Sequence, residues 1–186
     1  MALLVGAGCG SAGDAPAGAG GSEPPPEPPA VTTTEATAPP PATAEGSDDG
    51  HRPIPAVRFR YFDGSEGSPA DFAGTPTVIN FWASWCTPCI TEMPAFEAVH
   101  VELAADVAFL GINVGDEPGA ARQLAERTGV TYPLAEDPDS TIFQSFGGIG
   151  MPTTVFVDSE GMIVHMISSR LRAQDLRGLI SEHLGV

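Results

Sequence analysis

The chain has 186 residues, with 24 acidic side chains against eight basic ones and a formal net charge of −16. All eight basic residues are arginines and they form no cluster, which argues against nucleic-acid binding because phosphate contacts need concentrated positive charge. The three cysteines, Cys9, Cys86 and Cys89, are a poor fit to a secreted framework of paired disulfides.

The chain begins "MALLVGAGC", an apolar stretch followed by small residues and a cysteine. This layout resembles a bacterial lipoprotein signal, in which the cysteine carries the lipid. We interpret residues 1–9 as a partial signal ending at Cys9, and we expect its true start to lie upstream because the apolar stretch is short and lacks basic residues. A lipidated Cys9 places the protein at the outer face of the cytoplasmic membrane, held there only by the lipid anchor. Without lipidation, we expect a secreted protein with an incidental cysteine.

Residues 10–50 consist almost entirely of Gly, Ala, Ser, Thr, Pro and acidic residues. Such a segment buries too little apolar surface to offset the entropy of ordering it, so we predict a disordered linker that its prolines stiffen. Apolar periodicity begins near His51. Residues 51–186 are therefore predicted to form one compact domain with its own core.

Within that domain, "AVRFRYFDG" alternates in polarity and ends in Asp63–Gly64, which predicts a short strand and a hairpin. The run "TPTVINFWAS" is apolar throughout and rich in β-branched and aromatic residues, as expected for a strand buried on both faces. Helical spacing of apolar residues then follows Cys89. Pro94 lies inside this helix and is expected to kink it, because proline removes one backbone donor.

A second buried strand is predicted in "VAFLGINV", followed by a helix in "DEPGAARQLAERTG". We expect Asp116 to be the N-cap of this helix, Pro118 to lie in its first turn and Gly129 to end it.

A short helix follows, with Asp137 or Asp139 as its expected cap. The segment "TTVFVDSEGMIVHMIS" predicts a hairpin turning at residues 158–161, and residues 173–186 predict an amphipathic helix. The order β-β-α-β-α-α-β-β-α indicates an α/β fold with a mixed sheet.

Three interpretations compete for the pair Cys86 and Cys89. A zinc site needs two further ligands, and the four histidines are scattered singly. A static disulfide closing so short a loop restrains the unfolded chain very little. A redox pair fits better, because Cys86 stands at the predicted start of a helix, where free N–H groups and the helix dipole stabilise a thiolate. Cys89 is expected to face inward one turn later, and Pro88 suits the first turn.

The segments "NFWASWCTPCITEMP" and "GMPTTVFVDSEG" resemble the TlpA-like, membrane-tethered extracytoplasmic thioredoxins, and the resemblance covers residues 53–186. It implies a thioredoxin-like fold, in which helices flank a central mixed β-sheet that has an N-terminal β-hairpin extension. It also implies that no cofactor is needed beyond the redox-active Cys86–Cys89 disulfide. Protein thiols or disulfides are the implied substrates, and a membrane redox partner supplies or accepts electrons. We expect a monomer.

Carried over residue by residue, the resemblance makes Cys86 the attacking thiolate and Cys89 the resolving thiol. Trp85 shields the pair. Pro152 is the implied cis-proline beside the active site, and Met151 offers its backbone to a bound substrate chain. Thr87 and Pro88, between the two cysteines, belong to the surround of the site, but this dipeptide does not fix the direction of electron flow.

Two positions depart from the cytoplasmic thioredoxins, which carry a buried aspartate six residues before the first cysteine. Asn80 stands there and cannot accept a proton, so we expect a satisfied buried amide without a catalytic part. The TlpA-like proteins instead carry a glutamate three residues after the second cysteine, which Glu92 matches. At that spacing Glu92 lies on the same helical side as Cys89 and is predicted to shuttle its proton. The alternative is a solvated helix acid.

The sequence therefore predicts an extracytoplasmic thiol–disulfide oxidoreductase, most simply a reductase that serves cytochrome c maturation or general thiol homeostasis. A disulfide-introducing oxidase of the same fold is the main alternative. A peroxidase of the peroxiredoxin group needs Thr or Ser three residues before its cysteine, where Ala83 stands here. A tethered binding module without redox turnover is the non-enzymatic alternative.

Overall fold

The computed structural model describes residues 51–186. The predicted signal (1–9), the predicted linker (10–50) and the lipidation of Cys9 lie outside the described residues. The described elements follow in chain order: β1 (Arg52–Pro53), β2 (Phe59–Tyr61), β3 (Glu66–Gly67), the 3-10 helix η1 (Pro69–Phe72), β4 (Thr77–Trp82), α1 (Thr87–Leu103), β5 (Ala108–Val114), α2 (Pro118–Thr128), β6 (Leu134–Asp137), α3 (Thr141–Ser145), β7 (Thr153–Val157), β8 (Met162–Ile167) and α4 (Ala173–Leu184).

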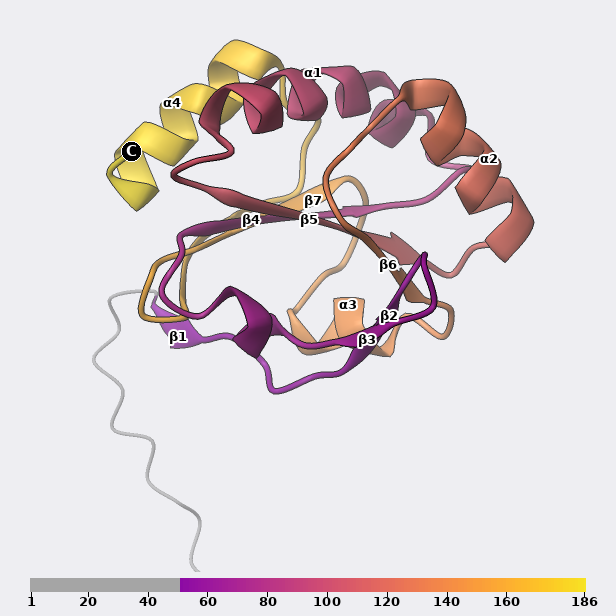
Figure 1. Cartoon of the computed structure of the whole chain (residues 1–186), viewed down its shortest axis with the longest axis horizontal. Coiled ribbons are helices and arrows are strands. Elements are labelled where there is room, and N and C mark those ends of the chain that lie inside the picture. The colour runs from indigo at the N-terminus through magenta and orange to yellow at the C-terminus, as the bar shows by residue number, and fades with distance from the viewer. Residues whose placement is uncertain (1–50) are drawn as a thin grey trace, which may run out of the picture. The chain divides into compact units, whose positions relative to one another are not determined.

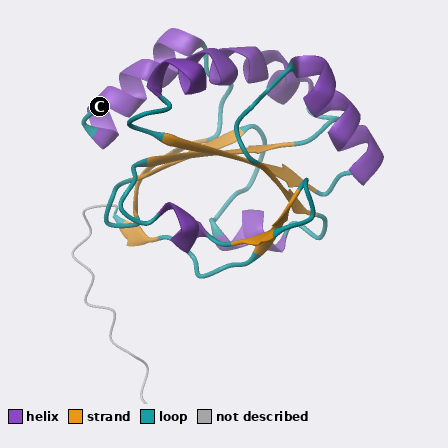
Figure 2. Ribbon diagram, in the orientation of Figure 1, coloured by secondary structure: helices purple, strands orange, loops and turns teal. Residues whose placement is uncertain are grey.

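The strands form one eight-stranded sheet in the order β1-β8-β7-β4-β5-β6-β2-β3. In its centre β4 runs parallel to β5 and antiparallel to β7, so the predicted mixed sheet is confirmed. Helices α1, α2 and α4 cover one face, and α3 lies on the other (Figure 1). Figure 2 shows the same layers by secondary structure, with the strands between the two groups of helices. Within residues 51–186, no helix is both long enough and apolar enough to cross a membrane.

Strand β4 is buried along its whole length, as its apolar sequence predicts. Its side chains alternate between the two faces of the sheet. Ile79 and Phe81 join the core that includes α3, whereas Val78 joins the core beneath α1 and α4. Asn80 and Trp82 share the face of Val78, so this alternation places a polar amide under the helix that carries the cysteines.

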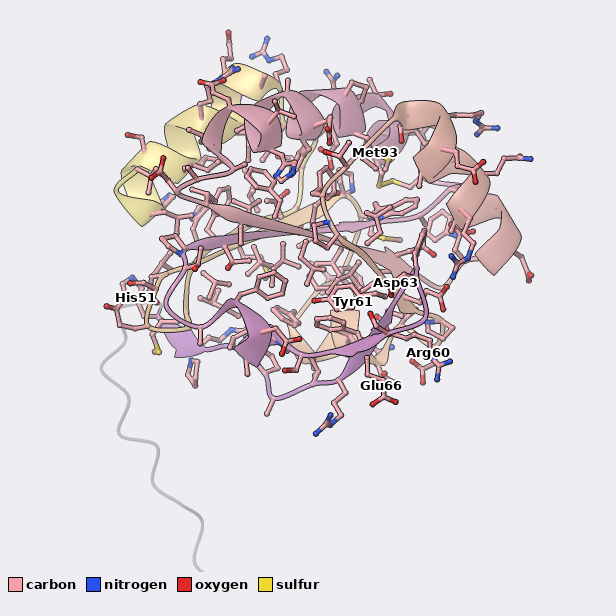
Figure 3. All side chains as sticks on the ribbon, viewed as in Figure 1. His51, Arg60, Tyr61, Asp63, Glu66 and Met93 are labelled. Atoms are coloured by element: carbon pink, nitrogen blue, oxygen red, sulfur yellow. A yellow bond between two sulfur atoms is a disulfide. The ribbon has the colours of Figure 1, made fainter. Side chains whose placement is uncertain are left out.

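Helix α1 begins directly after its N-cap residue, Cys86, and continues without interruption through Pro94. Its inner face buries five side chains at helical spacing: Cys89, Glu92, Met93, Phe96 and Val99. Figure 3 labels Met93 on the side of α1 that faces the sheet. The one carboxylate on this inner face, Glu92, is therefore positioned by the same periodicity that buries its apolar neighbours.

Several local predictions are confirmed and others are corrected. The hairpins β2–β3 and β7–β8 form as expected, and Gly129 ends α2 with φ 69°. Strands β1 and β6 were not predicted, because both are short and only partly apolar. Asp116 is not the N-cap of α2; that residue is Glu117. The N-cap residue of α3 is Ser140 rather than Asp137 or Asp139, although the Asp137 carboxylate accepts two backbone N–H groups of the first turn.

Candidate active site

Cys86 and Cys89 are joined by a disulfide at the N-terminal end of α1. The backbone N–H of Cys89 donates to Cys86 Sγ over 3.3 Å, so that sulfur caps the helix. Cys86 is 5% exposed and Cys89 is fully buried, whereas Thr87 and Pro88 between them are exposed. The geometry therefore separates an outer, slightly exposed sulfur from an inner, fully buried one.

The turn that precedes Cys86 is held from outside by the loop after β5. The Asp116 carboxylate accepts the backbone N–H of Ser84 over 2.5 Å and its hydroxyl over 2.8 Å. Partial burial raises the pKa of Asp116, but the hydrogen bonds from Asn113, Ser84 and the Glu117 N–H outweigh this and hold it below its ordinary value. The ionised carboxylate thus fixes the backbone that leads into the disulfide.

Trp85 lies between this anchored turn and the disulfide. Its side chain is 63% exposed, and its indole N–H donates to the carbonyl of Gly115 over 3.4 Å. A large aromatic group left on the surface beside Cys86 is available to cover the disulfide or to contact a bound chain.

Glu92 is almost completely buried, at 1% exposure, so the interpretation as a solvated helix acid is wrong. Oε1 accepts from Asn80 Nδ2 over 2.9 Å, and Oε2 accepts from the Leu171 backbone N–H over 3.0 Å. Burial raises the pKa of Glu92 to about 7, although these hydrogen bonds and the charge of Arg170 act in the opposite direction. A carboxyl group with such a pKa can gain and lose a proton near neutral pH.

Asn80 is buried as expected, but its amide is not fully satisfied. While Nδ2 bonds to Glu92, Oδ1 has no hydrogen-bond partner among residues 51–186. The expectation of a satisfied amide is therefore wrong.

The peptide bond between Met151 and Pro152 is cis, in agreement with the resemblance. Pro152 is buried, whereas Met151 is half-buried and packs against the cluster of buried side chains that contains both cysteines. The loop is closed by the Thr153 hydroxyl, which donates to the Gly150 carbonyl over 2.5 Å. Met151 is thus placed against the cluster that holds the disulfide, two residues before β7.

Two contributors to this site were missed by the sequence analysis. The Leu171 N–H is a backbone group, so no pattern of side chains in the sequence predicts its role. From the sequence, Asp116 is predicted only as a helix cap, because its partner Ser84 lies 32 residues away. Across residues 51–186, no group of three or more His, Cys, Asp or Glu side chains is arranged to hold a metal ion.

Comparisons with known proteins agree with this geometry. The sequence profile of the AhpC/TSA family matches residues 51–166. The thiol-disulfide oxidoreductase ResA of Geobacillus thermodenitrificans is 29% identical over 116 residues, 62% of this chain and 67% of that protein. The thioredoxin-like protein YneN of Bacillus subtilis is 30% identical over 112 residues, 59% and 65% of the two chains. The chain thus aligns with about two thirds of the length of these relatives.

Among solved structures, a DsbF homologue from Corynebacterium diphtheriae superposes with a TM-score of 0.67 at 28% identity, covering 74% of this chain and 90% of that one. The predicted resemblance and the thioredoxin-like fold are confirmed by these similarities.

Proposed function

The chain belongs to the AhpC/TSA family, and on that premise we propose that it reduces disulfide bonds in protein substrates. Its relative ResA is named a thiol-disulfide oxidoreductase, which agrees with the predicted enzyme class. The observation that carries the proposal is the Cys86–Cys89 disulfide, with one sulfur at the helix N-terminus and the other buried one turn from Glu92. The chemistry below starts from the reduced dithiol.

The first step belongs to Cys86. The N-terminal end of α1 stabilises its thiolate, because free N–H groups and the helix dipole favour negative charge there. The thiolate attacks one sulfur of a substrate disulfide. A bond forms between Cys86 Sγ and that sulfur while the substrate disulfide breaks, and the second substrate sulfur leaves as a thiolate.

The second step belongs to Cys89 and Glu92. The Cys89 thiol gives its proton to the Glu92 carboxylate, and the resulting thiolate attacks Cys86 Sγ. The mixed disulfide breaks, the substrate leaves with both of its sulfurs reduced, and the Cys86–Cys89 disulfide of the structure is formed again. Two electrons have passed from the protein to the substrate, and Glu92 later returns its proton to solvent.

We place Trp85, Thr87 and Pro88 at the rim of the site, where a substrate chain passes. Met151 is proposed to offer its backbone to that chain beside the cis bond to Pro152. Each cycle consumes one dithiol, so two electrons must be resupplied, and we propose a membrane redox partner as their source. Maintenance of apocytochrome c thiols or of general thiol balance is consistent with this direction, and disulfide introduction is the same chemistry in reverse.

The location is a separate proposal. We propose that Cys9 is lipidated, that residues 10–50 form a linker and that the domain of residues 51–186 works outside the cytoplasmic membrane, where disulfides persist. The support is the lipoprotein-like sequence before Cys9. Metabolic labelling with a fatty acid should mark the wild-type protein and not Cys9→Ser; equal labelling of both would contradict the anchor.

Turnover in an insulin-reduction assay tests the enzymatic proposal directly. Activity should survive Cys9→Ser, because that thiol is not part of the pair, and should fall to background in Cys86→Ser. Activity that persists without Cys86 would exclude the mechanism. An inactive wild-type protein that still binds unfolded chains would point to a binding module instead.

A further inference from the structure

The side-chain amide of Asn80 is engaged on one side only. Its Nδ2 donates to Glu92 Oε1 over 2.9 Å, whereas its buried Oδ1 accepts no hydrogen bond from the part of the chain that the structure describes. An unpaired carbonyl inside a protein is costly, and native structures keep few of them. The bond to Glu92 accounts for Nδ2 but does not explain why Oδ1 is buried without a partner.

Two buried hydroxyl groups, those of Thr154 and Tyr132, also lack partners within residues 51–186, and neither bonds to Asn80. Thr154 lies directly opposite Asn80 in the ladder between β4 and β7, so the two side chains share one face of the sheet. On its other side Asn80 pairs with Gly111, and the Tyr132 ring lies 3.1 Å from the point where a side chain at Gly111 would begin. A hydroxyl can donate or accept, so these neighbours suit an amide in either orientation.

The carboxyl group that Asn80 contacts changes its hydrogen-bonding character when it titrates. Ionised Glu92 only accepts, whereas protonated Glu92 carries an O–H donor. Its second contact, the Leu171 N–H, can only donate. The titratable and charged groups around Glu92 are Arg170 before α4, Tyr132 before β6 and the cysteine pair on α1 itself. The Asn80 amide differs from these groups because it carries a donor, Nδ2, and an acceptor, Oδ1, at equal distance along one side chain.

We propose that Asn80 is a positioning residue whose amide turns over as Glu92 gains or loses a proton. With Glu92 ionised, Nδ2 donates to it, and this is the amide orientation found in the structure. With Glu92 protonated, Oδ1 accepts the new O–H and Nδ2 turns away from Glu92, where the Thr154 or Tyr132 hydroxyl shifts to accept from it. Both protonation states of Glu92 are then paired through the same amide, and Oδ1 gains a partner when Glu92 is protonated.

This inference rests on the proposed function, in which the S–H bond of Cys89 breaks and its proton forms an O–H bond on Glu92. The rotation itself transfers no proton and breaks no covalent bond. It keeps Asn80 hydrogen-bonded to Glu92 in both protonation states, so the Glu92 side chain stays in place when it gains or loses its proton.

Nuclear Overhauser effects from the Nδ2 protons of Asn80 follow the orientation of its amide and require no mutation. The full chain, labelled with ¹⁵N and ¹³C and kept in its disulfide form, is titrated from about pH 5 to about pH 9, which spans the titration of Glu92. Above the Glu92 midpoint we expect contacts from these protons to the Glu92 side chain. Below it, those contacts should vanish and contacts to Thr154 or Tyr132 should appear. Contacts to Glu92 that persist at every pH would overturn the rotation.

The variant Asn80→Leu supplies a second measurement, read from the ¹³C resonance of the Glu92 carboxyl. A rotating amide stabilises both protonation states of Glu92, so its removal should raise the Glu92 midpoint by less than about one pH unit. A fixed donor stabilises the ionised state alone, and its loss would raise the midpoint by about one to two units. The larger rise would therefore overturn the proposal. Asn113→Leu is the matched control, because it removes another buried amide of the sheet that bonds to Asp116 rather than to Glu92. It should leave the midpoint unchanged.

Failure of the rotation and failure of the function are distinguishable. If insulin is reduced in a Cys86-dependent manner and the amide contacts do not change, only the rotation is wrong. If no insulin is reduced while the contacts do exchange, the amide rotates and the proposed function is wrong.

Discussion

The backbone N–H of Leu171 donates to Glu92 Oε2 over 3.0 Å, although 79 residues separate the two in the sequence. This bond joins the middle of the cysteine-bearing helix α1 to the segment that leads into α4. Together with the Asn80 amide, it gives each oxygen of a buried carboxylate one donor. These two hydrogen bonds stabilise the ionised form of Glu92 inside the core, whereas its burial favours the protonated form.

The first prediction concerns stability against pH in the disulfide form. The pKa of Glu92 is raised from 4.5 to about 7 by folding, so between these values the native state binds more protons than the unfolded state. The unfolding free energy should therefore fall as pH rises through this window, by roughly 3 kcal/mol. Glu92→Gln should lose this contribution. Urea denaturation of both proteins between about pH 4.5 and about pH 8.5 measures it.

Glu102→Gln is the matched control for that experiment. Glu102 is a carboxylate on the same helix, but it is exposed, and its hydrogen bond with Arg177 holds its pKa below the ordinary value. Its removal should not change the slope of stability with pH in the window of Glu92. An identical slope in the wild type and Glu92→Gln would show that Glu92 does not titrate as described.

A second prediction links Glu92 to the thiols. In the reduced protein, the alkylation rate of the active-site thiols should show an inflection near pH 7 that Glu92→Gln lacks, because the carboxyl exchanges a proton with Cys89. Iodoacetamide labelling followed by mass spectrometry gives the rate at each pH. Superimposable profiles would make Glu92 a bystander of the redox chemistry.

The third prediction separates the two cysteines. Cys89 is fully buried and Cys86 is not, so only Cys86 should attack a substrate. Cys89→Ser should therefore accumulate a mixed disulfide between Cys86 and the substrate, which a non-reducing gel detects, while turnover falls to background. Cys86→Ser should form no such adduct. Wild-type turnover by Cys89→Ser would mean that the inner sulfur is not the resolving thiol.

The fourth prediction concerns the anchor of the active-site turn. Asp116→Ala removes the acceptor of both Ser84 hydrogen bonds, and should lower the unfolding free energy at pH 7 by about 1–2 kcal/mol, because the carboxylate is only partly buried. The pKa of Asp116 is depressed in the folded protein, so this stabilisation is present above its ordinary value of 3.8 and is lost as pH falls through the folded value.

Urea denaturation at neutral and at strongly acidic pH checks this prediction. The difference between the wild type and Asp116→Ala should shrink in acid, where the carboxylate is protonated in both the folded and the unfolded wild type. Equal stability of the two proteins at neutral pH would show that the Ser84 contacts contribute nothing.

Local patterns predicted most of the elements and the core of the site. The apolar run of β4 and the helical spacing after Cys89 place Cys86 and Cys89 correctly, because each position depends on residues a few places away, whereas Glu92 was singled out by the family resemblance. Family resemblance supplied the cis bond at Pro152, which no pattern of side chains contains. The burial of Glu92 was anticipated only as one of two alternatives.

The remaining features depend on contacts between distant segments. Leu171 acts through its backbone, and Asp116 meets Ser84 only after β4 and β5 have paired, so neither role has a local signature. Strand β6 has four residues and two of them are acidic, and it is defined by its pairing with β5 and β2 rather than by its own pattern. The unsatisfied Oδ1 of Asn80 likewise follows from what surrounds it across three strands.

The reduction potential of the Cys86–Cys89 couple tests the central claim most directly. It is measured on the full chain equilibrated in glutathione or dithiothreitol buffers. A disulfide reductase should have a value near that of thioredoxin, about −270 mV, so that its dithiol gives up electrons readily. A value near about −120 mV, where strong disulfide oxidants lie, would contradict the reductase and assign the same site to disulfide introduction.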